Sequence, residues 1–151
     1  MRLKRLASFR SEEGTSILEV SMILSTLMLV LFGAIDFGRA YYLANEVVGA
    51  AQAAAAYGAT DPTDTTGMTN AAKDDAPDVS GLTATPSWGC ECSDGTGKSA
   101  SCTTAPSSCS ANVVYYATVS VSATYTSLVP WKGINSSFTI SSSSTMRSAS
   151  E

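Results

Sequence analysis

Residues 14–40 read GTSILEVSMILSTLMLVLFGAIDFGRA, and this stretch decides what kind of protein the chain is. Glu19 is the only charged residue between Ile17 and Ile35. The segment from Thr15 to the residue before Asp36 would form a helix about 31 Å long, which is the thickness of a bilayer core. We therefore expect a membrane-spanning helix, embedded to about residue 36, with one carboxylate in its apolar part.

Charge is distributed unevenly on the two sides of this segment. Residues 1–14, MRLKRLASFRSEEG, hold four basic and two acidic residues, whereas the remaining chain holds five basic and eleven acidic residues. A basic leader before an apolar run is a membrane-targeting pattern. Because positive flanks stay on the cytoplasmic side, we expect a cytoplasmic N-terminus and an exported body.

Three kinds of targeting segment have this general form. A cleaved secretory signal needs a small-x-small site, but 32–34 begins with Phe32 and 49–51 lies far beyond the apolar core. A plain signal anchor explains length and orientation but not Glu19, since a carboxylate in hydrocarbon is costly. A prepilin-like signal explains both, because Glu19 becomes the fifth residue of a chain cut after Gly14.

The stretch resembles the TadE-like family of pilin-related proteins (pseudopilins) from tight-adherence (Flp/Tad) type IV pilus systems. The resemblance rests on Gly14, Glu19 and the sequence FGAIDFGRA at 32–40, in which Asp36 replaces the usual Glu. Family members often carry Pro where this chain has Ser25. The major Flp pilins usually have Tyr where this chain has Val20, and this difference favours a minor subunit.

The resemblance implies a function in assembly. A membrane prepilin peptidase would cut between Gly14 and Thr15, and Glu19 would be the assembly residue, facing the new α-amino group of Thr15. That pair could form within one helix or between neighbouring subunits, the arrangement that the resemblance favours. Asp36 and Arg39, three residues apart, form either an interfacial charge pair at the membrane exit or an intersubunit contact.

The function expected from these features is a minor pilin-like structural subunit of a Tad-type pilus or secretion assembly. It would be anchored in the bacterial inner membrane by a single pass, with its body periplasmic or, in a pilus, extracellular. The expected partners are the prepilin peptidase, other pilin-like subunits, the Tad assembly machinery and the lipid bilayer. The alternative is a signal-anchored exoplasmic structural or binding module with no filament role.

The rest of the chain predicts an α+β, pilin-like fold. Small and aliphatic residues at helical spacing continue the helix through 15–58, and the body occupies 59–151. A loop is expected at 60–67, a short helix at 69–76 and a short edge strand at 82–86. Strict alternation predicts one long strand at 113–125, with the odd-numbered residues on one face, and 137–146 supplies a third. The long helix should pack on this small antiparallel sheet of about three strands.

Four cysteines, Cys90, Cys92, Cys102 and Cys109, lie in the exported body. Zinc spacing is absent and the chain has no histidine, so two disulfides stapling an exposed loop at 90–109 are expected rather than a metal site. Of the three pairings, one containing Cys90–Cys92 would be strained. We expect Cys90–Cys109 with Cys92–Cys102, without excluding the third.

Composition excludes several other functions. The chain lacks histidine, and no nucleophile with a base, cofactor loop or metal cluster is apparent, so neither an enzyme nor a cofactor is expected. A net charge of −4 argues against a nucleic-acid partner, which requires a basic face.

Overall fold

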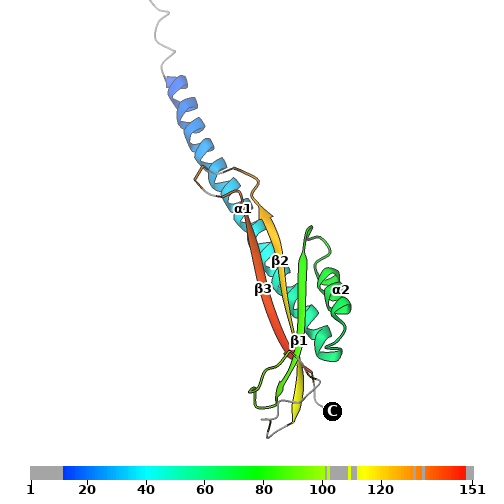
Figure 1. The fold of residues 1–151 in the computed structure, drawn as a ribbon. Coiled ribbons are helices and arrows are strands. Elements are labelled where there is room, and N and C mark those ends of the chain that lie inside the picture. Colours follow the sequence, from blue (N-terminus) through cyan, green and yellow to red (C-terminus); the bar gives the residue numbers. More distant parts are fainter. Residues whose placement is uncertain are drawn as a thin grey trace, which may run out of the picture. The chain divides into compact units, whose positions relative to one another are not determined.

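A computed structural model describes residues 12–100, 102, 109, 112–130, 132–133 and 135–148, with the side chains of 12–15 left out. The predicted leader, apart from the backbone of 12–14, and most of the loop between Cys102 and Cys109 lie outside the described residues. The elements are α1 (Glu12–Thr60), α2 (Thr65–Asp75), β1 (Thr83–Cys92), β2 (Val113–Thr126) and β3 (Ser137–Arg147), shown in Figure 1. The chain divides into two units, Met1–Gly38 and Arg39–Glu151, which are described separately.

Helix α1 has two halves of different composition. In the first, the side chains from Ser16 to Phe32 are all exposed, and the most apolar 18-residue window has no buried residue. In the second, small residues recur on one side, including the fully buried Ala50, Ala51 and Ala54. The helix ends at Thr60, just before Asp61-Pro62, where proline disfavours helical geometry in the residue before it. The predicted α+β fold, with a long apolar N-terminal helix and a three-stranded antiparallel sheet, is confirmed.

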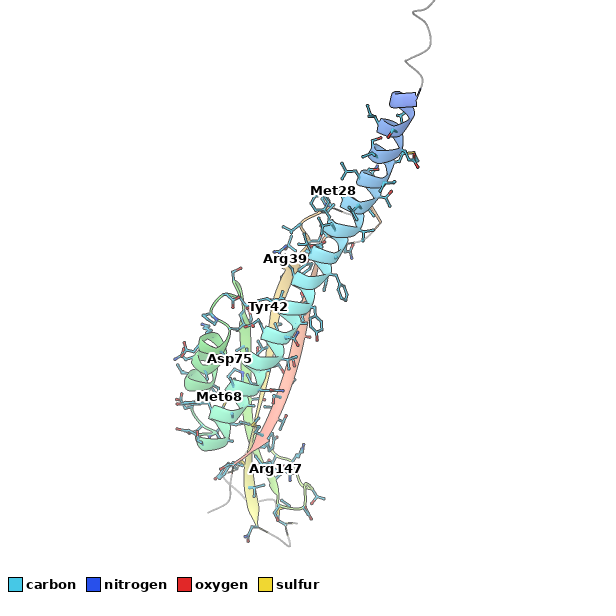
Figure 2. All side chains as sticks on the ribbon, turned by 180° about the vertical axis from the view of Figure 1, so that it is seen from behind. Met28, Arg39, Tyr42, Met68, Asp75 and Arg147 are labelled. Atoms are coloured by element: carbon cyan, nitrogen blue, oxygen red, sulfur yellow. A yellow bond between two sulfur atoms is a disulfide. The ribbon has the colours of Figure 1, made fainter. Side chains whose placement is uncertain are left out.

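The core of the second unit lies between α1, α2 and one face of the sheet. Its members are mostly alanine and valine, so the backbones of helix and sheet can approach closely. Met68 of α2 is the largest fully buried side chain (Figure 2). The buried members of this core cluster are Val47, Ala50, Ala51, Ala54, Met68, Ala72, Ala76, Ala117, Val119, Val121 and Ala123.

The opposite face of the sheet consists largely of hydroxyl side chains. The strands are ordered β1-β2-β3, and both pairings are antiparallel. The register places Thr85 beside Ser120 and Ser120 beside Ser143, so serines and threonines form rows across all three strands. Neighbouring hydroxyls on β2 and β3 bond to each other, as Thr118 and Thr145 do at 2.7 Å. This face needs no apolar cover because its side chains are polar.

Two local expectations were wrong. Residues 65–67 belong to α2 rather than to a loop, because Asp64 caps the helix by accepting a hydrogen bond from the Gly67 amide at 2.8 Å. That amide, together with the Tyr57 hydroxyl, holds the pKa of Asp64 below its usual value. The strand predicted at 82–86 continues to Cys92, and β1 is an edge strand of the sheet, as expected.

The alternation predicted for β2 is correct only from Ala117 onward. Near its start the pattern reverses, since Val114 is buried and Tyr115 is 42% exposed. The reason lies in the sheet register, which pairs Val114 with Glu91 of β1, a residue only 2% exposed. The hydroxyl face is therefore covered at this end of the sheet.

Gly58 lies where α1 packs closely against β2 and α2. A Cβ placed there would lie 2.5 Å from the Ala117 Cβ and 2.9 Å from the Met68 Cε. We expect Gly58→Ala to lower the free energy of unfolding by about 1–2 kcal/mol, because overpacking outweighs the gain in helix propensity. Urea unfolding of the detergent-solubilised chain would measure this. Gly38→Ala is the control, since a Cβ there meets nothing within 4 Å among the described residues. Equal stability of the two variants would contradict the prediction.

Candidate functional site

The predicted cleavage and assembly residues lie in the first half of α1. The backbone of Gly14 and Thr15 is helical, and α1 begins two residues before Gly14. Glu19 is exposed among exposed apolar neighbours, including Ile17, Leu18 and Val20. Around Met28, apolar side chains project from all sides of the helix (Figure 2). This arrangement is suited to lipid or to other apolar helices, but not to water.

Asp36 and Arg39 follow where the apolar segment ends. Asp36 is 7% exposed, which makes it the most buried charged residue of the described helix. Arg39 is exposed, and its guanidinium carbon lies 5.9 Å from the centre of the Tyr125 ring in β2. A cation over an aromatic face is stabilised by about 0.5–1 kcal/mol at an exposed site. The expected contact of Asp36 with Arg39 stays a prediction.

The four cysteines form two disulfides, and the expected pairing was wrong. The bonds join Cys90 to Cys102 and Cys92 to Cys109, with Cα separations of 5.7 and 5.5 Å. The backbones of Cys90 and Ser99 form two hydrogen bonds of 2.8 Å with each other. Ser99 therefore lies beside Cys90, and Cys102, three residues later, is close enough to bond to it.

The second disulfide follows from the sheet register. Cys92 pairs with Val113, and the Ser93 amide donates to the Asn112 carbonyl at 2.8 Å. The chain that enters β2 therefore passes beside Cys92, and Cys109 is three residues before Asn112. These backbone bonds bring each cysteine to its partner.

A buried carboxylate belongs to Glu91, the residue between Cys90 and Cys92 in β1. Glu91 is 2% exposed; it accepts a hydrogen bond from Arg147 Nε, and its second oxygen lies 3.6 Å from Lys98 Nζ. Arg147 is at the end of β3 (Figure 2), so this contact ties the last strand to the cysteine loop. Removing one partner of such a pair leaves an uncompensated buried charge. The sequence alone does not predict this cluster, because nothing local links Glu91 with a residue 56 positions away.

The turn within the cysteine loop is held by its own side chains. Asp94 accepts hydrogen bonds from the hydroxyl and the amide of Thr96, at 2.7 and 2.9 Å. These bonds, the hydroxyl first, hold the pKa of Asp94 below its usual value. Across the described residues, no three His, Cys, Asp or Glu side chains lie together so as to hold a metal ion. The cysteine loop is therefore held by two disulfides and by ion pairs to Glu91.

Comparison with known proteins bears directly on α1. Residues 14–56 match the model of the TadE-like protein family. The TadE-like segment includes Gly14, Glu19, Asp36 and Arg39, and it ends in the alanine-rich half of the helix. Comparison with curated proteins and with solved structures found no match. The resemblance seen in the sequence is thereby confirmed for the helix, whereas the sheet and the cysteine loop lie outside the TadE-like segment.

Among the described residues, the TadE-like segment overlaps a helix that is long and apolar enough to cross a membrane. Helix α1 contains a candidate span with a mean hydropathy of 2.1, near the N-terminus. The family match and the apolar segment therefore lie on the same helix, α1.

The disulfide connectivity leads to a direct chemical prediction. Non-reducing peptide mapping with cleavage after Glu91 and Lys98, followed by fragmentation of the linked peptides, should find Cys90–Cys102 and Cys92–Cys109. Replacing both Cys92 and Cys109 by serine should lower the free energy of unfolding by about 3 kcal/mol, because the released loop gains entropy in the unfolded chain. Ser93→Ala is the control, because Ser93 is exposed and adjacent to Cys92 but forms no disulfide. A fragment ion that links Cys90 to Cys109 would contradict the assignment.

Proposed function

We propose that this protein is a minor pilin-like subunit of a Tad-type pilus or secretion assembly, held in the inner membrane before it is assembled. The observation that carries the proposal is the first half of α1. It is helical and apolar, and it is exposed from Ser16 to Phe32 with a single carboxylate at Glu19. Such a surface requires lipid before assembly and the helices of other subunits afterwards.

The charges and cysteines support one orientation. The basic residues Arg2, Lys4, Arg5 and Arg10 precede α1, and the positive-inside rule keeps them in the cytoplasm. The body then lies on the outer side of the inner membrane, where an oxidising environment allows both disulfides to form. We infer a structural role for this body, rather than a catalytic one.

Processing by a prepilin peptidase gives Glu19 its proposed role. Cleavage after Gly14 would create a charged α-amino group on Thr15, four residues before the carboxylate. Each charge alone is costly in an apolar environment, and pairing them offsets much of that cost. If the amine of an incoming chain pairs with Glu19 of its neighbour, the pair sets the axial register between subunits. The other pilin-like subunits and the Tad machinery are the corresponding partners.

N-terminal sequencing and intact mass measurement of protein extracted from membranes and from sheared filaments test the proposal. The expected result is a mature chain that begins at Thr15 and is present in both fractions. If cells containing the peptidase yield only the full-length chain, and none is recovered with filaments, the protein is a signal-anchored module instead. That outcome would overturn the proposed function.

A further inference from the structure

A cavity lies within the second unit, between α1, β2 and the segment that joins α2 to β1. Its volume is about 370 Å³, which is within the range of pockets that hold small molecules. The lining combines a cation and a carboxylate with apolar and aromatic side chains. It includes Arg39, Tyr42 and Leu43 of α1, Asp78 and Val79 of the joining segment, and Tyr125 of β2.

The cation of this cavity is positioned but not neutralised. The Arg39 guanidinium carbon lies 5.9 Å from the centre of the Tyr125 ring, and Tyr125 is only 5% exposed, so the ring is fixed by packing. In the described part of the chain, no residue forms an ion pair or a hydrogen bond with the Arg39 guanidinium. Its N–H donors are therefore available to an anion, and their geometry matches a carboxylate.

Negative charge gathers around Tyr42 in the same cavity. Asp78 accepts a hydrogen bond from the Tyr42 hydroxyl at 2.8 Å, and no cation among the described residues pairs with this carboxylate. The hydrogen bond to Asp78, then partial desolvation and the charges of Asp78 and Glu46, raise the pKa of Tyr42 to about 12. Tyr42 therefore stays a neutral donor beside two carboxylates, and this side of the cavity suits a positively charged group.

Helix α1 fixes the spacing between the positive and negative sides. Arg39 and Tyr42 lie nearly one turn apart on the helix (Figure 2), a rise of about 4.5 Å, and Glu46 follows one turn later, about 10 Å from Arg39. Arg39 and Asp78 form no ion pair with each other, so one ligand can meet both. A single amino acid has both charges on one carbon and is too short, whereas an extended dipeptide spans about 7 Å.

We propose that this cavity binds a short zwitterionic peptide, with the peptide carboxylate at Arg39 and the peptide ammonium at Asp78. Glu46 adds a second negative charge on the ammonium side, and Leu43 and Val79 contact the peptide's small side chains. An acidic sugar or a phosphate fits less well, because the two carboxylates repel an anion that carries no cation. Peptide binding is a function beyond the proposed assembly role, since it requires neither a filament nor a second subunit.

A chemical-shift titration of the full, isotope-labelled chain in detergent micelles tests the proposal. The probe is dialanine, and two analogues each lack one of its charges: N-acetyl-dialanine has no ammonium, and dialanine amide has no carboxylate. Dialanine should shift the amide signals of Val79 and Ser80, which line the cavity, to saturation. Each analogue should bind roughly threefold to fivefold more weakly, the effect of losing one exposed charge pair.

Two variants assign the ends of the peptide. Arg39→Gln should bind dialanine and dialanine amide equally, while it still prefers dialanine to the acetylated analogue. Asp78→Asn should lose most of the preference for a free ammonium and keep the preference for a free carboxylate. Lys73→Gln and Asp74→Asn are the matched controls, because both residues are exposed on α2 outside the cavity, and both preferences should remain. Thermal unfolding verifies that each variant has kept its fold.

Three outcomes would overturn the proposal, and they are distinguishable. If dialanine leaves the Val79 and Ser80 signals unchanged, the cavity does not bind peptides. If both analogues bind as tightly as dialanine, or if Arg39→Gln keeps the preference for a free carboxylate, the two charges do not select the ligand. If no peptide binds but Arg39→Gln protein is missing from sheared filaments, the cavity is a contact between subunits, and the proposed assembly function stands without peptide binding.

Discussion

Glu19→Ala protein is expected to fold, form both disulfides and insert into the membrane, yet to be nearly absent from filaments. Insertion should be unimpaired because the substitution only increases the hydrophobicity of the exposed first half of α1. Assembly should fail because the Thr15 amine of each incoming chain would have no carboxylate to meet in an apolar environment.

The expected loss is large. Removing one partner of a buried ion pair costs about 3–5 kcal/mol, because the other charge is left uncompensated. Recovery in sheared filaments should therefore fall by at least about tenfold relative to the membrane pool, since each 1.4 kcal/mol is a factor of ten. Quantitative immunoblotting of the two fractions would measure the ratio.

A matched control is available on the same helix. Glu46 lies in the second half of α1, outside the apolar segment, and is half-buried. Glu46→Ala removes an equivalent carboxylate and should leave the filament fraction unchanged. Wild-type recovery of Glu19→Ala protein would show that Thr15 and Glu19 pair within one helix or not at all.

Replacing Gly14 with tryptophan should abolish processing. The proposed prepilin peptidase would have to accommodate the residue before the scissile bond, and a bulky side chain there would exclude the chain from its active site. We expect intact mass spectrometry to find residues 1–14 still attached, and the protein to remain in the membrane. The filament fraction should be lost, because no α-amino group forms at Thr15.

Gly14→Ala is the control for this substitution. Alanine is small, so this variant should still be cut and assembled if the size of the side chain at position 14 determines whether the peptidase cleaves. Gly14→Trp and Glu19→Ala also check each other, since both should share the assembly defect, although only Gly14→Trp retains the leader. A mature N-terminus at Thr15 in the Gly14→Trp protein would refute the proposed cleavage site.

Much of this protein could be predicted from sequence because the signals are local. The apolar run at 15–35, the helix stop at Asp61-Pro62 and the alternation within 117–125 can each be recognised within a short window of sequence. The carboxylate at Glu19, spaced five positions from Gly14 and followed by the motif at 32–40, was sufficient to indicate the TadE-like family. Each of these features lies within one element or one short segment.

The cysteine pairing and the ion-paired cluster could not be predicted in this way. Cys90 bonds to Cys102 because the Ser99 backbone is hydrogen-bonded to the Cys90 backbone. Cys92 bonds to Cys109 because Cys92 pairs with Val113 in the sheet. Glu91 is buried because Arg147 reaches it from the far end of the chain. Sequence spacing contains none of these register relations, and the same cysteine pattern is compatible with three pairings.

By itself, then, the sequence determined the apolar helix, its single carboxylate, the α+β class and the family resemblance, because these depend on interactions over a few residues. Only the tertiary structure decided which cysteines are bonded, which face of β2 is covered near Val114, and that Tyr125 meets Arg39 at the end of the apolar segment. Those outcomes depend on strand register and on packing between segments far apart in the chain. A shift of one residue in register would turn every side chain of a strand to the other face.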